Sequence, residues 1–174
     1  MSGKLTGALN LRRASRPESV QTVRYATICP LGMATMGEHA NNRDIGNAWT
    51  AYILADLHEN WPARCDFGLT EVIAATDMSS GTSRKDTELF MGLMGWLTNN
   101  GYIQHRGALM DGKHQMVELT TLGHAVLGGV PKSLEKPLGD ELKNAAKSGA
   151  SEAGRATIAE LVGLVFSIGA RLLG

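Results

Sequence analysis

One stretch of the chain, Thr70–Leu127, constrains its fold more than any other. Apolar residues recur there at the helical period in two segments, and a two-stranded hairpin and a short closing helix follow. The second helix is expected to begin with a capping box formed by Ser83 and Asp86, and to end at Asn99-Asn100-Gly101, where glycine permits a left-handed stop. This order of elements predicts a mainly α-helical domain with one small β-hairpin.

The apolar pattern around the hairpin turn predicts its register. A two-residue Asp-Gly turn would place Ile103 and Leu119 on opposite faces of the hairpin. A three-residue loop over residues 110–112 pairs these two residues and keeps the apolar side chains on one face. We therefore expect the three-residue loop, with Gly112 in the left-handed conformation.

Further helices are expected on either side of the hairpin. An amphipathic helix should run over Arg43–Trp61, and a shorter one should begin with Thr70 as its N-cap. Thr120 or Thr121 is expected to cap the closing helix. The residues expected on the apolar face of the first helix are Ile45, Trp49, Tyr52, Ile53 and Leu57.

Three short motifs carry a resemblance to a known family. They are WLTNNGYI at the end of the second predicted helix, Asp111-Gly112-Lys113 in the hairpin loop, and VELTTLGHAVL at the exit. Together they resemble the MarR-type winged-helix proteins, over roughly Arg43–Leu127. The resemblance implies a winged-helix fold, and it implies a regulator or accessory factor that binds double-stranded DNA.

The resemblance also implies which residues contact DNA. Three of them lie at the start of the recognition helix, two lie on the hairpin, which is called the wing in this family, and one would lie near the minor groove. In that order they are Ser83, Arg84, Lys85, Lys113, His114 and Arg106.

Charge is distributed unevenly along the chain. Residues 1–42 have no sustained periodicity and are expected to form a flexible arm; residues 1–41 carry five basic and two acidic residues. The cluster Arg12, Arg13 and Arg16 is either a solvated tail or an arm that contacts phosphate. Between Arg43 and Leu127 there are six basic and ten acidic residues, so the predicted module has a net negative charge and the arm has a net positive charge.

An acidic module leaves a second function open. Small and apolar residues on the outward face of the second helix and on the wing would suit a protein partner, and Lys113 stands where arginine is usual in the family. The alternative is an adaptor that docks a protein through this surface. The residues concerned are Met91, Gly92, Gly95, Leu109 and Met110.

Residues 131–174 are expected to form appended helices, one starting near Pro137 and one after Ser151. The second has an apolar face for which three interpretations are open: a dimerisation or core-covering helix, a membrane-surface helix, or a membrane span. As an oligomerisation face it would consist of Ile158, Leu161, Val162, Val165, Ile168 and Leu172.

The sequence carries no convincing catalytic or cofactor motif. A His124–Asp111 pair is the one catalytic combination left open, and we expect no enzyme activity and no cofactor. A zinc site made from Cys29, His39, His58 and Cys65 lacks the short ligand spacings of structural zinc modules, so no metal is expected. Two separated cysteines and the lack of a signal-like N-terminal run predict a cytoplasmic protein.

Overall fold

The computed structural model describes residues 41–147 and 151–174. Within them the chain is mainly helical, as predicted, and the expected hairpin is part of a small antiparallel sheet of short strands. Along the chain the elements are α1 (Asn42–Glu59), β1 (Cys65–Phe67), α2 (Leu69–Thr76), α3 (Ser83–Asn99), β2 (Ile103–Gln104), β3 (Gly107–Ala108), β4 (His114–Leu119), α4 (Thr121–Gly128), α5 (Leu138–Lys147) and α6 (Glu152–Leu173).

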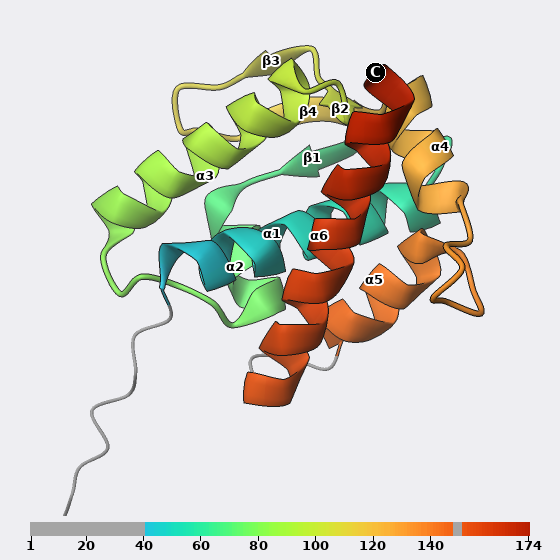
Figure 1. Ribbon diagram of the computed structural model, residues 1–174. Helices are drawn as coiled ribbons and strands as arrows, with labels where there is room; N and C mark the ends of the chain where they lie inside the picture. Colours follow the sequence, from blue (N-terminus) through green and yellow to red (C-terminus); the bar gives the residue numbers. More distant parts are fainter. Residues whose placement is uncertain (1–40, 148–150) are drawn as a thin grey trace, which may run out of the picture. The chain divides into compact units, whose positions relative to one another are not determined.

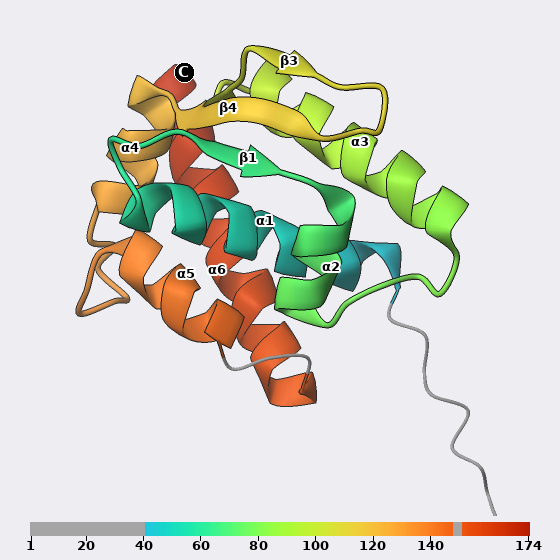
Figure 2. The same cartoon turned by 180° about the vertical axis from the view of Figure 1, so that it is seen from behind.

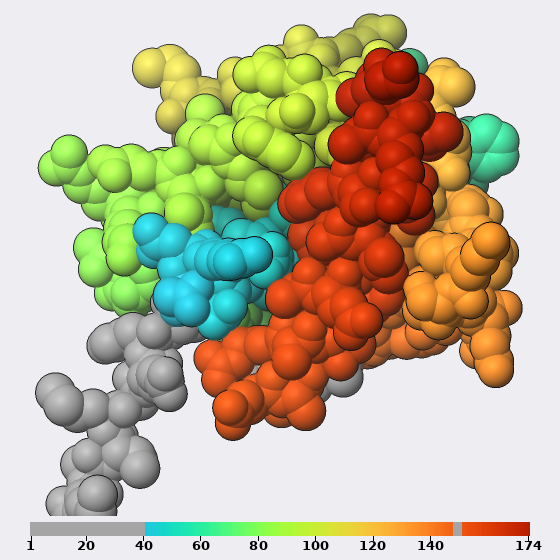
Figure 3. Space-filling view, viewed as in Figure 1, coloured from blue at the N-terminus to red at the C-terminus, as the bar shows by residue number. Residues whose placement is uncertain are grey.

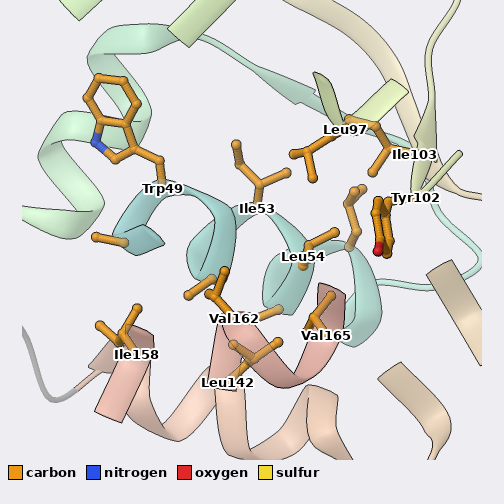
Figure 4. Packing of buried hydrophobic residues seen from close by; sticks show 14 of the residues in the cluster. Trp49, Ile53, Leu54, Leu97, Tyr102, Ile103, Leu142, Ile158, Val162 and Val165 are labelled. Atoms are coloured by element: carbon orange, nitrogen blue, oxygen red, sulfur yellow. The ribbon is translucent and has the colours of Figure 1, made fainter. Parts of the chain in front are cut away.

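Helix α1 lies at the centre of the core. Figures 1 and 2 show α3 and the sheet on one side of it, α5 on the other, and α6 crossing it. Figure 4 shows Ile53 toward Leu97 and Ile103, while Leu142 and Val162 lie on the opposite side of the helix. A helix that is buried on most of its circumference needs apolar or small residues all round. The expected single apolar face was therefore incomplete, because α1 also buries Ala48, Ala51, Leu54 and Ala55.

Strand β4 is the middle strand of the sheet. It pairs antiparallel with β1 on one side and with β2 and β3 on the other. Ile103 lies opposite Leu119, which confirms the predicted register. The amide of Leu109 donates to the carbonyl of Lys113 at 2.8 Å, and Gly112 has φ +81°, which confirms the three-residue loop. Strand β1 was not predicted, because three residues are too few to show a period.

Two predicted helix starts were wrong. Helix α2 begins at Leu69 with Gly68 as its N-cap, so Thr70 lies inside the helix. Helix α3 has Thr82 as its N-cap, and the Thr82 side chain makes no capping hydrogen bond. The expected box fails because the Asp86 carboxylate is buried and bonds to the preceding loop instead.

The predicted end of α3 and the predicted cap of α4 are confirmed. Gly101 has φ +72°, and the amide of Tyr102 donates to the carbonyl of Leu97 at 3.0 Å across the end of α3. Thr120 caps α4, since its hydroxyl accepts a hydrogen bond from the amide of Gly123 at 3.1 Å. These contacts fix how the hairpin leaves α3 and enters α4.

Helices α5 and α6 belong to the same hydrophobic core as the elements before them. Leu138 and Leu142 are fully buried, on the face that was predicted for α5. One cluster of buried residues extends from Ile45 to Val165, so the expected boundary at residues 130 and 131 does not separate two cores. Residues 148–150, between these two helices, lie outside the described residues.

The predicted oligomerisation face of α6 is largely turned into this core. Four of its six residues are buried within the same chain, Ile168 is half-buried, and only Leu172 is well exposed. A side chain covered inside one molecule offers no surface to a second, so the assignment was wrong for those four; they serve the core-covering role. They are Ile158, Leu161, Val162 and Val165.

Candidate functional site

The exposed start of α3 carries the first three predicted DNA-contacting residues, Ser83, Arg84 and Lys85. Arg84 Nε lies 3.0 Å from Glu88 Oε1 one turn later, and these side chains are 89% and 67% exposed. Such an exposed pair contributes only about 0.3–0.5 kcal/mol, so Arg84 can leave it at little cost. Lys85 makes no ion pair with any residue that the structure describes.

A buried carboxylate fixes the loop that leads into α3. Asp86 accepts hydrogen bonds from the Ser79 hydroxyl at 2.6 Å and from the Ser80 amide at 2.7 Å. Burial opposes the charged form, but these hydrogen bonds outweigh it and hold the pKa of Asp86 below its usual value. The loop is thus anchored from α3, while no side chain in the described part of the chain caps the first-turn amides of α3.

The two predicted cations of the hairpin differ in their surroundings. Lys113 Nζ lies 3.4 Å from Glu71 Oε1 on α2, and this pair partly neutralises it. Arg106, between β2 and β3, is exposed and makes no ion pair with the described part of the chain. Of the two, Arg106 is therefore the one available to a ligand.

His114 was expected on the hairpin surface, and this prediction was wrong. Its side chain is 3% exposed and packs edge-on against Phe90 and His105, with ring centroids 5.7 and 4.8 Å away. Its Nδ1 lies 3.2 Å from the Gly112 carbonyl oxygen. Burial lowers the pKa of His114, and the neighbouring His105 lowers it further.

A β-bulge explains the burial of His114. By simple alternation His114 would face the same side as Glu118, which points outward. Met116 has φ +52°, and the pairing of β4 with β1 shifts by one residue there. The extra residue reverses the alternation, so His114 turns inward toward α3.

Exposed apolar side chains also lie on α3 and the hairpin, the elements that carry Arg84, Lys85 and Arg106. Leu109 and Met110 are exposed at the hairpin tip, and Met91 on α3 is 39% exposed, with its sulfur close to Gly112. Trp96, near the end of α3, is 42% exposed. It stacks on Tyr102 and meets Phe166 of α6, and Figure 3 shows α6 beside the end of α3.

Those candidate residues for catalysis and metal binding that the structure describes do not come together in one site. His124 packs against Trp61 near the start of α4, whereas Asp111 lies in the loop at the other end of β4. Among the described residues no three His, Cys, Asp or Glu side chains lie close enough to hold a metal. Cys29, His39 and the arm residues Arg12, Arg13 and Arg16 lie outside those residues.

By length and composition, α6 could also cross a membrane. Its most apolar window has a mean hydropathy of 1.7, and 28% of that window is buried within the chain. The apolar residues of α6 that lie inward contact α1, α4 and α5. The apolar helix was therefore predicted from the sequence, and the structure shows that one side of it packs against other helices of the chain.

A hollow of about 160 Å³ between α1, α2 and α5 is a further feature, and sequence reasoning missed it. Its walls include the small side chains Ala55, Ala75 and Ala146, together with Tyr52. Since they come from three separate helices, no motif in the sequence marks them.

No family model, no curated protein and no solved structure matches this chain.

Proposed function

We propose that this chain is a cytoplasmic, non-enzymatic winged-helix protein that binds duplex DNA as a regulator or accessory factor. The observation that carries the proposal is the start of α3, where Arg84 and Lys85 are exposed beside first-turn amides that lack a side-chain cap. Free amides and basic side chains at a helix N-terminus suit phosphate groups.

The order of the elements supports the winged-helix part of the proposal. Helix α1, strand β1, helices α2 and α3 and the β2–β4 hairpin follow one another along the chain, and β1 joins the hairpin in one sheet. This is the arrangement that the resemblance to MarR-type proteins implies.

The N-terminal half of α3 is the part that fits a DNA groove. A helix about 10–12 Å across matches a major groove about 12 Å wide. The C-terminal half is partly covered, since Trp96 contacts Phe166 of α6. DNA would therefore meet Ser83, Arg84 and Lys85, with Arg106 as a further phosphate contact.

Binding to a mixed-sequence duplex, followed by fluorescence anisotropy over a series of salt concentrations, tests the proposal. The double variant Arg84→Ala, Lys85→Ala should bind more weakly. The plot of log affinity against log salt should become less steep, its slope falling in magnitude by about 2, since each lost phosphate contact accounts for roughly 0.9. The control Lys132→Ala, Lys136→Ala removes the same charge far along the chain and should change little. Absence of duplex binding at low salt, or an equal loss in the control, would contradict the proposal.

Protein docking is the second candidate, and the exposed Met91 and Met110 favour it. Bare thioether and aliphatic side chains suit an apolar partner better than a phosphate backbone. A photo-crosslinking residue at position 91, activated in cells, separates the two functions. Nuclease-sensitive adducts support DNA binding, and protease-sensitive adducts without nucleic acid support docking.

A further inference from the structure

The geometry of the hollow between α1, α2 and α5 points to a binding site for a small zwitterion with an apolar body, the chemistry of a free aliphatic or aromatic amino acid. This site is separate from the surface formed by Ser83, Arg84, Lys85 and Arg106, and it does not depend on the function proposed for that surface.

The size of the hollow sets the size of the apolar body. At about 160 Å³ it is close to the roughly 150 Å³ apolar cavity that accommodates benzene in an engineered protein. Alanines from three helices line it, at positions 55, 75 and 146, and none of them has atoms beyond Cβ with which to fill it. The ring of Tyr52 adds a further apolar wall.

Acidic groups on the α1 side of the rim suit an ammonium group. Asp56 and Glu59 lie one turn apart on α1, and both line the hollow. Asp56 is held by the Asn60 side chain, whose Nδ2 donates to Asp56 Oδ1 at 3.1 Å. Glu59 is paired with Lys143. A carboxylate oriented by a neighbour, with lone pairs still free, can accept a charged N–H donor.

Basic groups on the α5 side suit a carboxylate. Lys143 and Lys147 lie one turn apart on α5, and both line the hollow. Lys147 makes no ion pair with any residue in the described ranges. A polar hollow shares these two lysines and is also lined by Lys136, Asp140 and Asn144, so there is room for the charged end and the lysines outnumber the one carboxylate.

The presence of both a carboxylate and an ammonium group at the hollow distinguishes between an anion, a cation and a zwitterion as its ligand. A simple anion would leave Asp56 facing it, and a simple cation would leave Lys147 facing it. A zwitterion satisfies both at once while its side chain occupies the apolar hollow. Each charge-assisted hydrogen bond would be short and directional, so both charges should be needed for binding.

Ligand-observed NMR on the full chain tests the site with phenylalanine and leucine as probes. Phenethylamine and 3-phenylpropionate, which each carry one of the two charges, are the matched ligands. Phenylalanine or leucine should bind, and both one-charge ligands should bind about tenfold more weakly or worse, since a hydrogen bond to a charged group is lost. Absence of binding by both amino acids at millimolar concentration, or equal binding by either one-charge ligand, overturns the proposal.

Variants locate the binding within the hollow. Asp56→Asn and Lys147→Gln should each raise the Kd about tenfold, and Ala146→Leu should abolish binding by filling the space. Glu135→Gln and Lys132→Gln are matched charge controls, because neither residue lines the hollow. Circular dichroism checks that each variant is folded. Unchanged binding in folded Ala146→Leu, or an equal loss in the two controls, places the ligand elsewhere and overturns the assignment.

Discussion

At the scale of single residues, His114 shows how a polar side chain is accommodated in this core. Its ring fills space between Phe90 and His105, and one nitrogen is near a backbone carbonyl in the turn. Among the residues that the structure describes, no carboxylate contributes to the shift of its pKa, and the one side chain that adds a charge effect is the imidazole of His105. The neutral ring is therefore the form that the folded chain accepts.

The sign of this shift predicts how stability depends on pH. Because the pKa of His114 is lower in the folded chain than the usual value of about 6.5, the unfolded chain binds more protons below that pH. The contribution is complete above about pH 6.5 and is lost as the pH falls toward the lowered folded value. The pKa of His124 is lowered by burial and acts in the same direction.

We therefore expect the free energy of unfolding, measured by denaturant titration, to fall between about pH 7 and pH 5. His114→Gln should make this slope shallower, whatever its effect on stability at neutral pH. Asp86 titrates below its usual pKa and does not contribute in this window. A slope identical in the variant and the wild-type chain would show that His114 is not the titrating group.

At the scale of elements, the junction between α3, the hairpin and α4 depends on close backbone approach. A Cβ on Gly123 would overlap the carbonyl oxygen of Tyr102 and crowd the Leu119 side chain. The glycine of VELTTLGHAVL is thus needed because another backbone segment passes directly against the first turn of α4. By contrast, a Cβ on Gly163 of α6 would have no neighbouring atom within 4 Å.

These two glycines give opposite predictions for the same substitution. Gly123→Ala should lower the free energy of unfolding by about 1–3 kcal/mol, because the overlap is with backbone that cannot move aside cheaply. Gly163→Ala should raise it by up to about 1 kcal/mol, because alanine has the better helix propensity and meets open space. Thermal or urea denaturation measures both. A stabilising Gly123→Ala would contradict the close approach.

The sequence predicted those elements whose signals are local. Gly112, Gly101 and Thr120 each act on neighbouring backbone, and each behaves as expected. The failures involve partners beyond the neighbouring turn of the chain. Asp86 bonds to Ser79 and Ser80 in the preceding loop, and His114 turns inward because of a bulge in the pairing of β4 with β1, which is distant in sequence. Of the candidate site, the exposure of Arg84 and Lys85 was predictable, whereas the pairing of Lys113 with Glu71 of α2 was not.

At the scale of the whole molecule, α1 is the helix against which α2, α3, α5, α6 and the sheet pack. Its side toward α3 and the sheet follows the pattern read from the sequence, and α5 and α6 cover its second side. A domain confined to residues 43–130 would leave that second side in water. The described chain is one core in which the first helix and the last two are interdependent.

Removal of α5 and α6 should therefore unfold the rest. A chain that ends at Gly129 should lose its cooperative thermal transition and bind a hydrophobic dye, because burial of apolar area is the main stabilising term and α1 is left half uncovered. A chain that ends at Arg171 is the control, since it removes the exposed Leu172 and Leu173. A cooperative transition in the shorter chain would show that residues 130–174 are an appendage after all.

The central position of α1 also bears on how fast the chain folds. The helices that cover its second side follow it by about a hundred residues, so these contacts close very long loops. Helical proteins usually fold quickly because their contacts are local, and folding slows as the mean sequence separation of contacts increases. This chain should fold more slowly than its helix content suggests. Until α5 and α6 dock, half of its central helix is an exposed apolar surface, the kind of surface on which chaperones act.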